Sequence, residues 1–350
     1  MYGILKYSGL SAKIGFMLGN LLKQDDYDTL MRKKTVQEVT GYLKDSTYYT
    51  NLLSQVDEHT IHRGQLEKIL KASLIDDYIK LLEFMHGDVK KFLNFAVLRY
   101  EIEDLKILLR IFNTEHNTKV TRDSLLFLQK YGTVDVEALA DSENLAAFIQ
   151  KLKGSVYYDV LLPFITNTQH LNLFMIEMSL DMYFFSLIWK QKERLLKGQD
   201  KKLVSYSFGS EIDILNILWV YRCKKFYNIQ KEMIYAYIIP YGNQLRKADI
   251  KALVESKDEK EVQKVIAKTP YASLFKETNS YYYERRLAYY VHKMHKRFLR
   301  NHRFSIATVM AYLHLKEIEI RNIISLIEGI RYGLSYEQIA AYIVQGRTDM

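Results

Sequence analysis

A short pattern of acidic and aliphatic residues, Glu-Ile-[Glu/Asp]-x-x-[Lys/Asn]-Ile, occurs three times in the 350-residue chain. The copies begin at Glu101, Glu211 and Glu317, so 110 and 106 positions separate them. Solenoid repeats are roughly 20 to 50 residues long, whereas this period is the size of a small domain. The chain is therefore constrained to fold as copies of one domain-sized module.

Other residue types recur at matching distances from this pattern. A glutamate lies 34, 34 and 33 residues before the three copies, and a Tyr-x-x-Leu motif lies further upstream. Before that motif comes a helix-capping residue type, with a leucine five residues before it and apolar residues four and eight residues after it. The recurring positions are Glu67, Glu177 and Glu284; Tyr49, Tyr158 and Tyr271, with Leu52, Leu161 and Leu274; Thr35, Asn144 and Asp258; Leu30, Leu139 and Leu253; Val39, Phe148 and Val262; and Leu43, Leu152 and Ile266. The spacing predicts three modules at residues 1–115, 116–227 and 228–350, the last with a C-terminal extension.

Each module is predicted to be helical throughout. Thr, Asn and Asp accept a hydrogen bond from the free amides at a helix start, and apolar residues four and eight positions later share one helical face. No segment shows the alternation of a strand over a useful length. The 15 glycines and 3 prolines are few for a turn-rich β protein. The predicted fold class is all-α.

The composition excludes several classes of protein. Cys223 is the single cysteine, which excludes internal disulfides and cysteine-built metal centres. The most apolar segment, Leu171 to Trp189, contains Glu177 and Asp181, which predicts a buried helix rather than a membrane span. Glycine and serine interrupt the apolar residues at the N-terminus, which we expect to be part of the mature protein rather than a signal peptide. The net charge of +9 permits an acidic partner without identifying one.

No catalytic motif is recognisable in the chain. It contains no phosphate-binding glycine loop, no H-E-x-x-H and no G-x-S-x-G. Cys223 lies between two cations that could activate a thiol, but inert packing is the favoured interpretation of a lone helical cysteine.

The acids of the tripled pattern are candidates for general acid–base chemistry. They are Glu101 and Glu103, Glu211 and Asp213, and Glu317 and Glu319. Residues two apart on a helix point to nearly opposite sides, and three copies of one catalytic site are rarely needed. Gly209 and Ser210 suggest that the acids lie in the first turn of their helices, where they would complement the helix dipole. An architectural role is therefore favoured.

The densest positive charge lies on a predicted helix from Arg285 to Arg303. Its candidate interface residues are Arg285, Arg286, Lys293, Lys296, Arg297 and Arg300. Aromatic residues lie among them: Tyr289, Tyr290, Phe298 and Phe304. Because cations neutralise phosphates and aromatic rings stack on bases, nucleic-acid binding stays open as an alternative. No known DNA-binding motif accompanies the helix, so a solvated or protein-contacting face is favoured.

The same helix contains His292 and His295, three residues apart, with His302 nearby. Such spacing could place two imidazoles on one metal ion. The surrounding lysines and arginines would repel a cation, so we interpret these histidines as part of a solvated basic face. No metal site is predicted.

The ordered triplicate resembles a known family, the C subunits of bacterial and archaeal V/A-type ATPases, which are called d subunits in vacuolar ATPases. The features that carry the resemblance are the three Glu-Ile motifs, the Tyr-x-x-Leu motifs, the opening from Tyr7 to Leu30, and the end from Lys316 to Ile339. It covers essentially the whole chain.

The resemblance implies a three-lobed helical funnel with pseudo-threefold symmetry. Members of the family lie between the rotor shaft and the proteolipid ring, at the cytoplasmic face of the membrane, and transmit torque without catalysing a reaction. It implies no cofactor, no small-molecule substrate and no nucleic acid, and a membrane contact only through the ring. Two alternatives stay open: a basic helical nucleic-acid-binding protein, and a helical enzyme with an unrecognised site.

Overall fold

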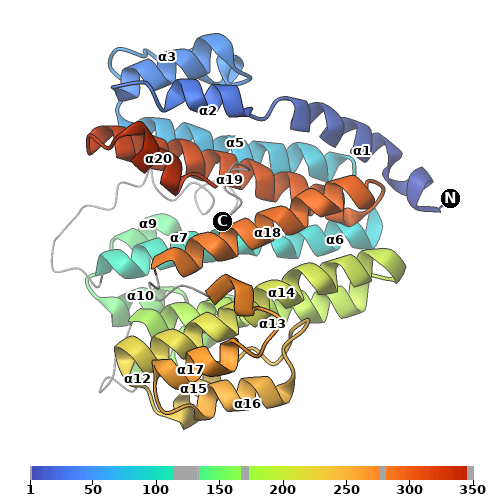
Figure 1. Cartoon of the computed structure of the whole chain (residues 1–350), viewed down its shortest axis with the longest axis vertical. Coiled ribbons are helices and arrows are strands. Elements are labelled where there is room, and N and C mark those ends of the chain that lie inside the picture. Colours follow the sequence, from blue (N-terminus) through green and yellow to red (C-terminus); the bar gives the residue numbers. More distant parts are fainter. Residues whose placement is uncertain (1, 113–131, 133, 167–172, 276–280, 345–350) are drawn as a thin grey trace. The chain divides into compact units, whose positions relative to one another are not determined.

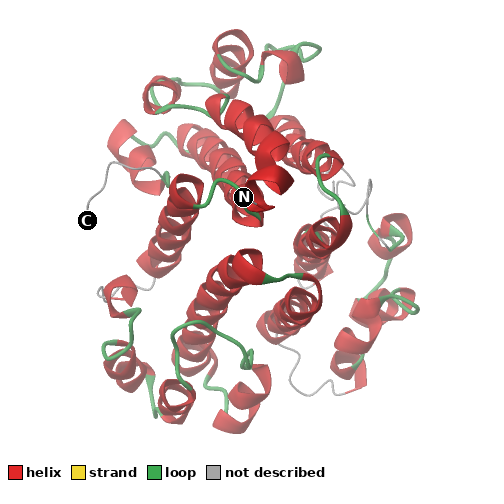
Figure 2. Cartoon of the chain, turned by 90° about the vertical axis from the view of Figure 1, so that its right-hand side faces the viewer, coloured by secondary structure: helices red, strands yellow, loops and turns green. Residues whose placement is uncertain are grey.

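The computed structural model describes residues 2–112, 132, 134–166, 173–275 and 281–344. Every regular element in these ranges is a helix (Figure 2), which confirms the all-α prediction. The chain divides into two compact units: residues Met1–His86 with Asn279–Met350 form unit 1, and Gly87–Thr278 form unit 2. This division does not test the predicted boundaries of three modules, which stay a prediction.

Unit 1 combines the two ends of the chain. Its helices are α1 (Tyr2–Gly19), α2 (Gln24–Leu30), α3 (Val36–Ser46), α4 (Thr50–Leu53), α5 (Arg63–Glu83), α18 (Tyr281–Asn301), α19 (Ile306–Arg331) and α20 (Tyr336–Tyr342). The core is built around α19, which packs against α1, α3, α5, α18 and α20 (Figure 1). Its apolar residues surround the whole helix, so α19 is buried on nearly all sides.

Unit 2 is built around the helix pair α13 and α14. The described helices are α6 (Gly87–Ala96), α7 (Leu98–Phe112), α9 (Val136–Ala140), α10 (Leu145–Lys151), α11 (Val156–Leu161), α12 (Pro163–Thr166), α13 (Leu173–Leu195), α14 (Gly198–Arg222), a π-helical turn η3 (Cys223–Tyr227), α15 (Lys231–Tyr237), α16 (Lys247–Glu255), α17 (Glu259–Ile266) and a 3-10 turn η4 (Ala272–Phe275). A short connection returns the chain from α13 to α14, and Gly198 has the positive φ of 54° that this reversal requires. Helices α6, α7 and α11 pack on α13, whereas α16 and α17 pack on α14.

The predicted capping residues all begin helices. Thr35, Asn144 and Asp258 are the N-caps of α3, α10 and α17, and each side chain accepts a backbone hydrogen bond, at 3.1, 2.9 and 2.9 Å respectively. The leucines five residues earlier and the apolar residues four and eight residues later are all at most 1% exposed. The local features that define the repeat therefore recur three times in the structure.

The tyrosine of the predicted Tyr-x-x-Leu motif is buried in the first and third copies, whereas the second copy buries the residue before it. The leucine of the motif is the buried partner only in the second copy, and in the other two copies the buried partner lies one residue later. Tyr49, Tyr157 and Tyr271 are the buried rings, and the buried partner lies four residues later at Leu53, Leu161 and Phe275. Tyr158, the predicted residue, is half-buried. The turn decides which tyrosine points inward: each buried tyrosine donates its backbone N–H to a hydroxyl two residues earlier, from Thr47, Ser155 and Thr269, at 3.2, 3.2 and 3.3 Å.

The expected placement of the repeated acids at helix starts is wrong for two of the three pairs. Glu101 lies in the first turn of α7. Glu211 and Asp213 lie in the second half of α14, and Glu317 and Glu319 lie in the middle of α19. In these two helices, the acids therefore do not complement the dipole at a helix end.

The segment from Leu171 to Trp189 falls largely on α13, whose residues are described from Leu173 onward. Among the described residues, none of the helices combines the length and the apolar character that crossing a membrane requires.

Candidate protein-interaction surface

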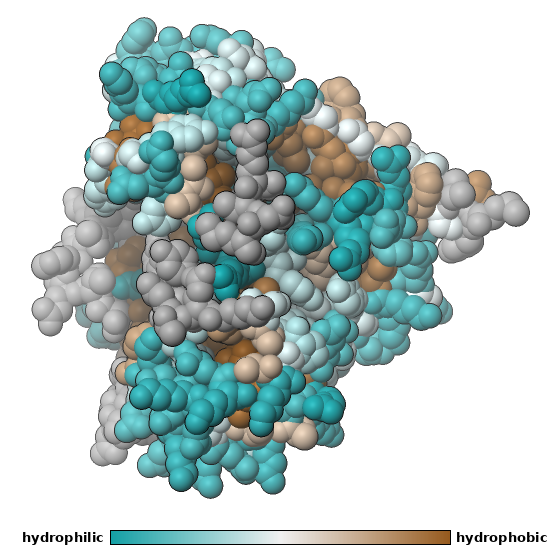
Figure 3. Space-filling model, viewed as in Figure 1, coloured by the Kyte–Doolittle hydropathy of each residue, from teal (hydrophilic) through white to brown (hydrophobic). Residues whose placement is uncertain are grey.

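Four cations form a continuous face on α18. Lys293, Lys296, Arg297 and Arg300 are all exposed. Their spacing of three, four and seven residues places them on one side of the helix. Hydrophilic side chains gather over the right-hand half of α18 in Figure 3. We call these four residues the basic stripe.

The two other predicted interface residues are less accessible. Arg285 and Arg286, near the start of α18, are half-buried. The structure therefore brings four of the six predicted cations together as an exposed group and leaves two at its edge.

The opposite side of α18 is fixed against α19. Met294 and Phe298 are at most 5% exposed, and α18 and α19 pack along their lengths. This packing fixes the rotation of α18 about its own axis. The four stripe side chains therefore project from the side of α18 that faces away from α19.

His292 and His295 belong to this buried side, which corrects their interpretation as part of a solvated face. They are 5% and 3% exposed. The ring of His295 stacks on that of His314 in α19, with centroids 4.5 Å apart, and His292 lies 6.0 Å from the same ring. Burial, and secondarily the charge of Lys296, lowers the pKa of His292 to about 4. Within the described ranges, no group of three or more His, Cys, Asp or Glu residues is placed to hold a metal ion.

The glutamates at the repeated position on two other helices, Glu67 of α5 and Glu177 of α13, pair with nearby cations, in contrast to the basic stripe. On α5, Glu67 pairs with Arg63 at 3.0 Å and with Lys71 at 2.8 Å. On α13, Glu177 pairs with Arg110 of α7 at 2.7 Å. None of the four stripe residues forms an ion pair with a carboxylate in the part of the chain that the structure describes. The stripe is therefore an unneutralised positive surface.

The aromatic residues around the stripe are poorly placed for stacking on bases. Phe298 is 3% exposed, and Tyr289 and Tyr290 are half-buried. Phe304, at 40% exposed, lies beyond the end of α18. The cations that could neutralise phosphates are thus exposed, whereas most of the aromatic rings that could stack on bases are not.

Three of the six repeated acids, Glu101, Asp213 and Glu319, are buried, and each lies against a tyrosine that is distant in the sequence. We call such a buried acid–tyrosine contact a clasp. In unit 2, one oxygen of Asp213 accepts hydrogen bonds from the hydroxyl of Tyr271 at 2.8 Å and from the backbone N–H groups of residues 243 to 245. Asp213 is fully buried, and its neighbour two residues earlier, Glu211, pairs with Arg99 near the surface. The buried acid thereby joins α14 to segments 30 and 58 residues further along the chain.

Unit 1 contains a second clasp of the same kind. Glu319 of α19 accepts hydrogen bonds from the hydroxyl of Tyr49, at 2.7 Å, and from the backbone N–H of Leu22. Lys316, which is fully buried, donates to both Tyr49 and Glu319, at 2.7 and 3.0 Å. Burial, followed by the charge of Glu319, raises the pKa of Tyr49 well above its ordinary value, so the hydroxyl stays protonated and donates.

The first acid of the pattern supplies the third case. Glu101 is fully buried, and its carboxylate lies close enough to Tyr157 to raise, after burial as the larger cause, the pKa of that tyrosine. Each buried acid is thus matched with a tyrosine from the following copy of the repeat or, for Glu319, from the first copy. This arrangement supports the architectural role expected for these acids.

Two buried asparagines on α14 and α19 form paired hydrogen bonds with the backbone, which were not predicted from the sequence. Asn216 accepts from the backbone N–H of Ile239 and donates to its carbonyl, both at 3.0 Å. Asn322 makes the same two bonds to Val344, at 2.9 and 3.2 Å. These asparagines occupy the Lys/Asn position of the tripled pattern. The signal in the sequence that could have revealed them is an asparagine at the same position in two copies. In the first copy this position is Lys106, which pairs with Glu103 and Asp181.

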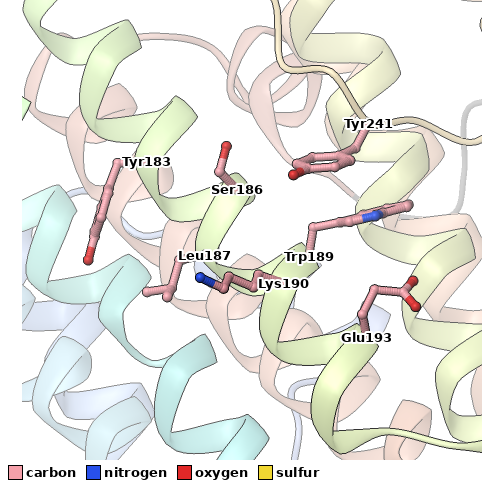
Figure 4. Close-up of a pocket in the computed structure, with 7 residues that line it drawn as sticks. All are labelled: Tyr183, Ser186, Leu187, Trp189, Lys190, Glu193 and Tyr241. Atoms are coloured by element: carbon pink, nitrogen blue, oxygen red, sulfur yellow. The ribbon is translucent and has the colours of Figure 1, made fainter.

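Two further features of unit 2 are the thiol of Cys223 and a cavity on α13. Burial raises the pKa of the Cys223 thiol to about 11, so it is inert, as predicted. A cavity of about 560 Å³ lies along one face of α13 (Figure 4). Trp189 in this cavity is stacked on Tyr241 at 5.1 Å, with the ammonium of Lys192 3.2 Å from the Trp189 ring centroid. Hydrogen bonds from Lys201 and Lys192 lower the pKa of Glu193 at its edge, so this carboxyl is a paired anion rather than a general base.

Comparison of the sequence with known proteins identifies a family and several relatives. The family model described as ATP synthase (C/AC39) subunit matches residues 10–342. The chain is 24% identical over 328 residues to the A-type ATP synthase C subunit of Methanosphaera stadtmanae, covering 91% of this chain and 82% of that protein. It is 26% identical over 353 residues to the A-type ATP synthase C subunit of Methanococcoides burtonii, covering 97% of this chain and 94% of that protein.

These relatives match 91% and 97% of this chain, and the tripled pattern and the buried clasps lie within the residues 10–342 that the family model matches. The chain belongs to the ATP synthase (C/AC39) subunit family.

Proposed function

We propose that this protein is a non-catalytic central-stalk subunit of a rotary V/A-type ATPase. In this role it is a socket between the rotor shaft and the membrane proteolipid ring, and it couples ATP hydrolysis or synthesis to proton or sodium ion transport. The observation that carries the proposal is the near-complete match to relatives named as the C subunit of A-type ATP synthases.

The proposed architecture is three helical modules, at residues 1–115, 116–227 and 228–350, arranged as a pseudo-threefold funnel. It is supported by three capped helices with matching buried positions and by three acid–tyrosine pairs, two of which use the second acid of the pattern and one of which uses the first. Buried hydrogen bonds between distant segments resist shear, because breaking one leaves a desolvated polar group. A part that transmits torque requires such stiffness.

We propose further that the protein is bound at the cytoplasmic face of the membrane, with its contact to the membrane made through the ring. Its partners are then the rotor-shaft subunits and the proteolipid ring, without a cofactor, a small-molecule substrate or a nucleic acid. The exposed basic stripe is the proposed site of protein contact, with Arg285 and Arg286 at its edge.

The test is reconstitution with membranes from cells that lack the protein. These membranes are expected to lose ATP-driven ion uptake, and addition of the purified chain is expected to restore it. The restored complex should yield the shaft and ring subunits by mass spectrometry when the chain is purified by an affinity tag. Normal ion uptake in membranes lacking the chain would show that it has no coupling role.

A further inference from the structure

The basic stripe has a composition that sets it apart from other charged surfaces of the chain. Residues 285 to 303 contain no aspartate or glutamate. Cations three and four residues apart on a helix repel one another, and the described residues supply no carboxylate that relieves this repulsion. The surface is therefore complementary to a negative partner outside the chain.

The class of partner follows from what lies between the cations. Of the apolar residues of α18 near the stripe, Met294 and Phe298 are buried and Leu299 is half-buried, so the stripe has no exposed large apolar side chain to enter the acyl region of a membrane. The half-buried state of Tyr289 and Tyr290 likewise leaves few rings for bases. A purely cationic edge that contains guanidinium groups suits carboxylates, which accept paired hydrogen bonds from arginine.

From these observations we infer that the basic stripe docks an acidic protein segment, with carboxylates spaced along one edge. The inference rests on the proposed function, because it identifies the kind of partner that this surface meets in the rotary complex. The four cations extend over eight residues of helix, from Lys293 to Arg300, or about 10 Å along the axis. The complementary segment is therefore two turns of a helix or a short loop that presents three or four acids on one side.

Zero-length cross-linking in the intact complex tests the nature of the partner. A carbodiimide joins a lysine amine to a carboxylate that it contacts, without adding a spacer. The expected products are amide links from Lys293 or Lys296 to an aspartate or glutamate of another protein of the complex. The variant K293R/K296R keeps the charge and removes both amines, so it should assemble normally and lose these links. Absence of links at both lysines, while other lysines of the chain react, would overturn the inference, as would links confined to this chain.

Charge reversal measures how much the stripe contributes to binding. The variant K293E/K296E/R297E/R300E should rebind to membranes depleted of the protein at least tenfold more weakly than the wild type, and wild-type binding should weaken as salt is raised. The matched control reverses four exposed lysines near α17, at Lys257, Lys260, Lys264 and Lys268, which lie among the acids Asp258, Glu259 and Glu261. It changes the net charge equally and should rebind with wild-type affinity. A glutamine version of the stripe variant serves if the reversed helix does not fold, as judged by circular dichroism.

The outcomes separate the inference from the proposed function. If the wild type does not rebind to depleted membranes at all, the proposed function fails. If the wild type rebinds and the stripe variant does so with equal affinity and equal salt dependence, only the inference fails. Binding of the wild type to vesicles of phosphatidylglycerol alone, or to a single-stranded oligonucleotide, with the same loss in the stripe variant, would assign the stripe to lipid or to nucleic acid and overturn the acidic-protein partner.

Discussion

The hydroxyl of Tyr49 joins two charged groups that have almost no access to water, Lys316 and Glu319. Replacing Tyr49 by Phe removes a hydrogen bond from each. We expect a loss of about 2 to 3 kcal/mol in the free energy of unfolding, because the bonds involve buried charges. Urea denaturation of the variant checks this value.

Tyr271 and Tyr48 provide graded comparisons. Asp213 keeps three backbone donors when Tyr271 is replaced by Phe, so the expected loss is smaller, about 1 kcal/mol. Tyr48 is 40% exposed, and its replacement by Phe should change stability by less than about 0.5 kcal/mol. Equal losses for Tyr49 and Tyr48 would contradict a clasp.

His292 makes stability depend on pH. Its pKa falls from 6.5 to about 4 in the folded chain, so the unfolded chain binds more protons between these values. The contribution of the neutral ring is fully present above pH 6.5 and is lost as the pH falls toward 4, by at most about 3 kcal/mol. The variant H292F should flatten the fall in unfolding free energy over this window. Substitution of the exposed His59 by Gln is the control and should leave the slope unchanged.

At the scale of elements, capping and periodicity were sufficient to predict the starts of α3, α10 and α17 and the apolar positions that these helices bury. The predictions of helix starts and of buried rings were wrong where a contact with another part of the chain, or the local turn, determines the role of a residue. Gly209 suggests a helix start by its type alone, but it lies inside α14, where an added Cβ would be 3.0 Å from the backbone of Gly242. Glycine is needed there for close approach, not for a helix boundary. Likewise, the turn at Ser155, and not the apolar spacing, selects Tyr157 as the buried ring.

The candidate surface was predicted as a charged helix, but its division into two faces was not. Charge alone could not separate Lys293 from His292, because both are basic types on adjacent positions. The packing of α18 on α19 makes the distinction. The partners of the repeated acids were also beyond reach, since Glu319 and Tyr49 are 270 positions apart.

Two glycines should respond to alanine in opposite directions. At Gly242 a Cβ would lie 2.1 Å from the Oδ1 atom of Asp213, so G242A should displace this carboxylate and cost about 2 to 4 kcal/mol. At Gly15, inside α1, a Cβ meets nothing within 4 Å. G15A should stabilise the protein by about 0.5 to 1 kcal/mol through helix propensity. Thermal unfolding of both variants gives the two signs, and a stabilising G242A would contradict the close contact.

At the scale of the whole molecule, the two units differ in how the chain forms them. Unit 2 is continuous from Gly87 to Thr278, whereas unit 1 needs both ends of the chain. A fragment of residues 87–278 should therefore show helical circular dichroism and a cooperative thermal transition. A fragment of residues 1–86 should not, because α18 and α19 are missing and the apolar faces of α1, α3 and α5 have nothing to cover them.

Mixing the 1–86 fragment with a second fragment of residues 279–350 is the matching control. Helical signal should rise beyond the sum of the two separate spectra. If residues 1–86 fold alone with a cooperative transition, α19 is not the centre of that unit.

The clasp between Tyr49 and Glu319 cannot form until both residues have been synthesised. At about 5 to 20 residues per second on the ribosome, the 270 positions between them take roughly 14 to 54 s to translate. Throughout that interval the first helices have emerged without the helix that covers them, while the residues of unit 2 have time to fold. We therefore expect the newly synthesised N-terminal segment to be the part of the chain whose apolar faces stay uncovered longest, and slower translation should lengthen this exposure.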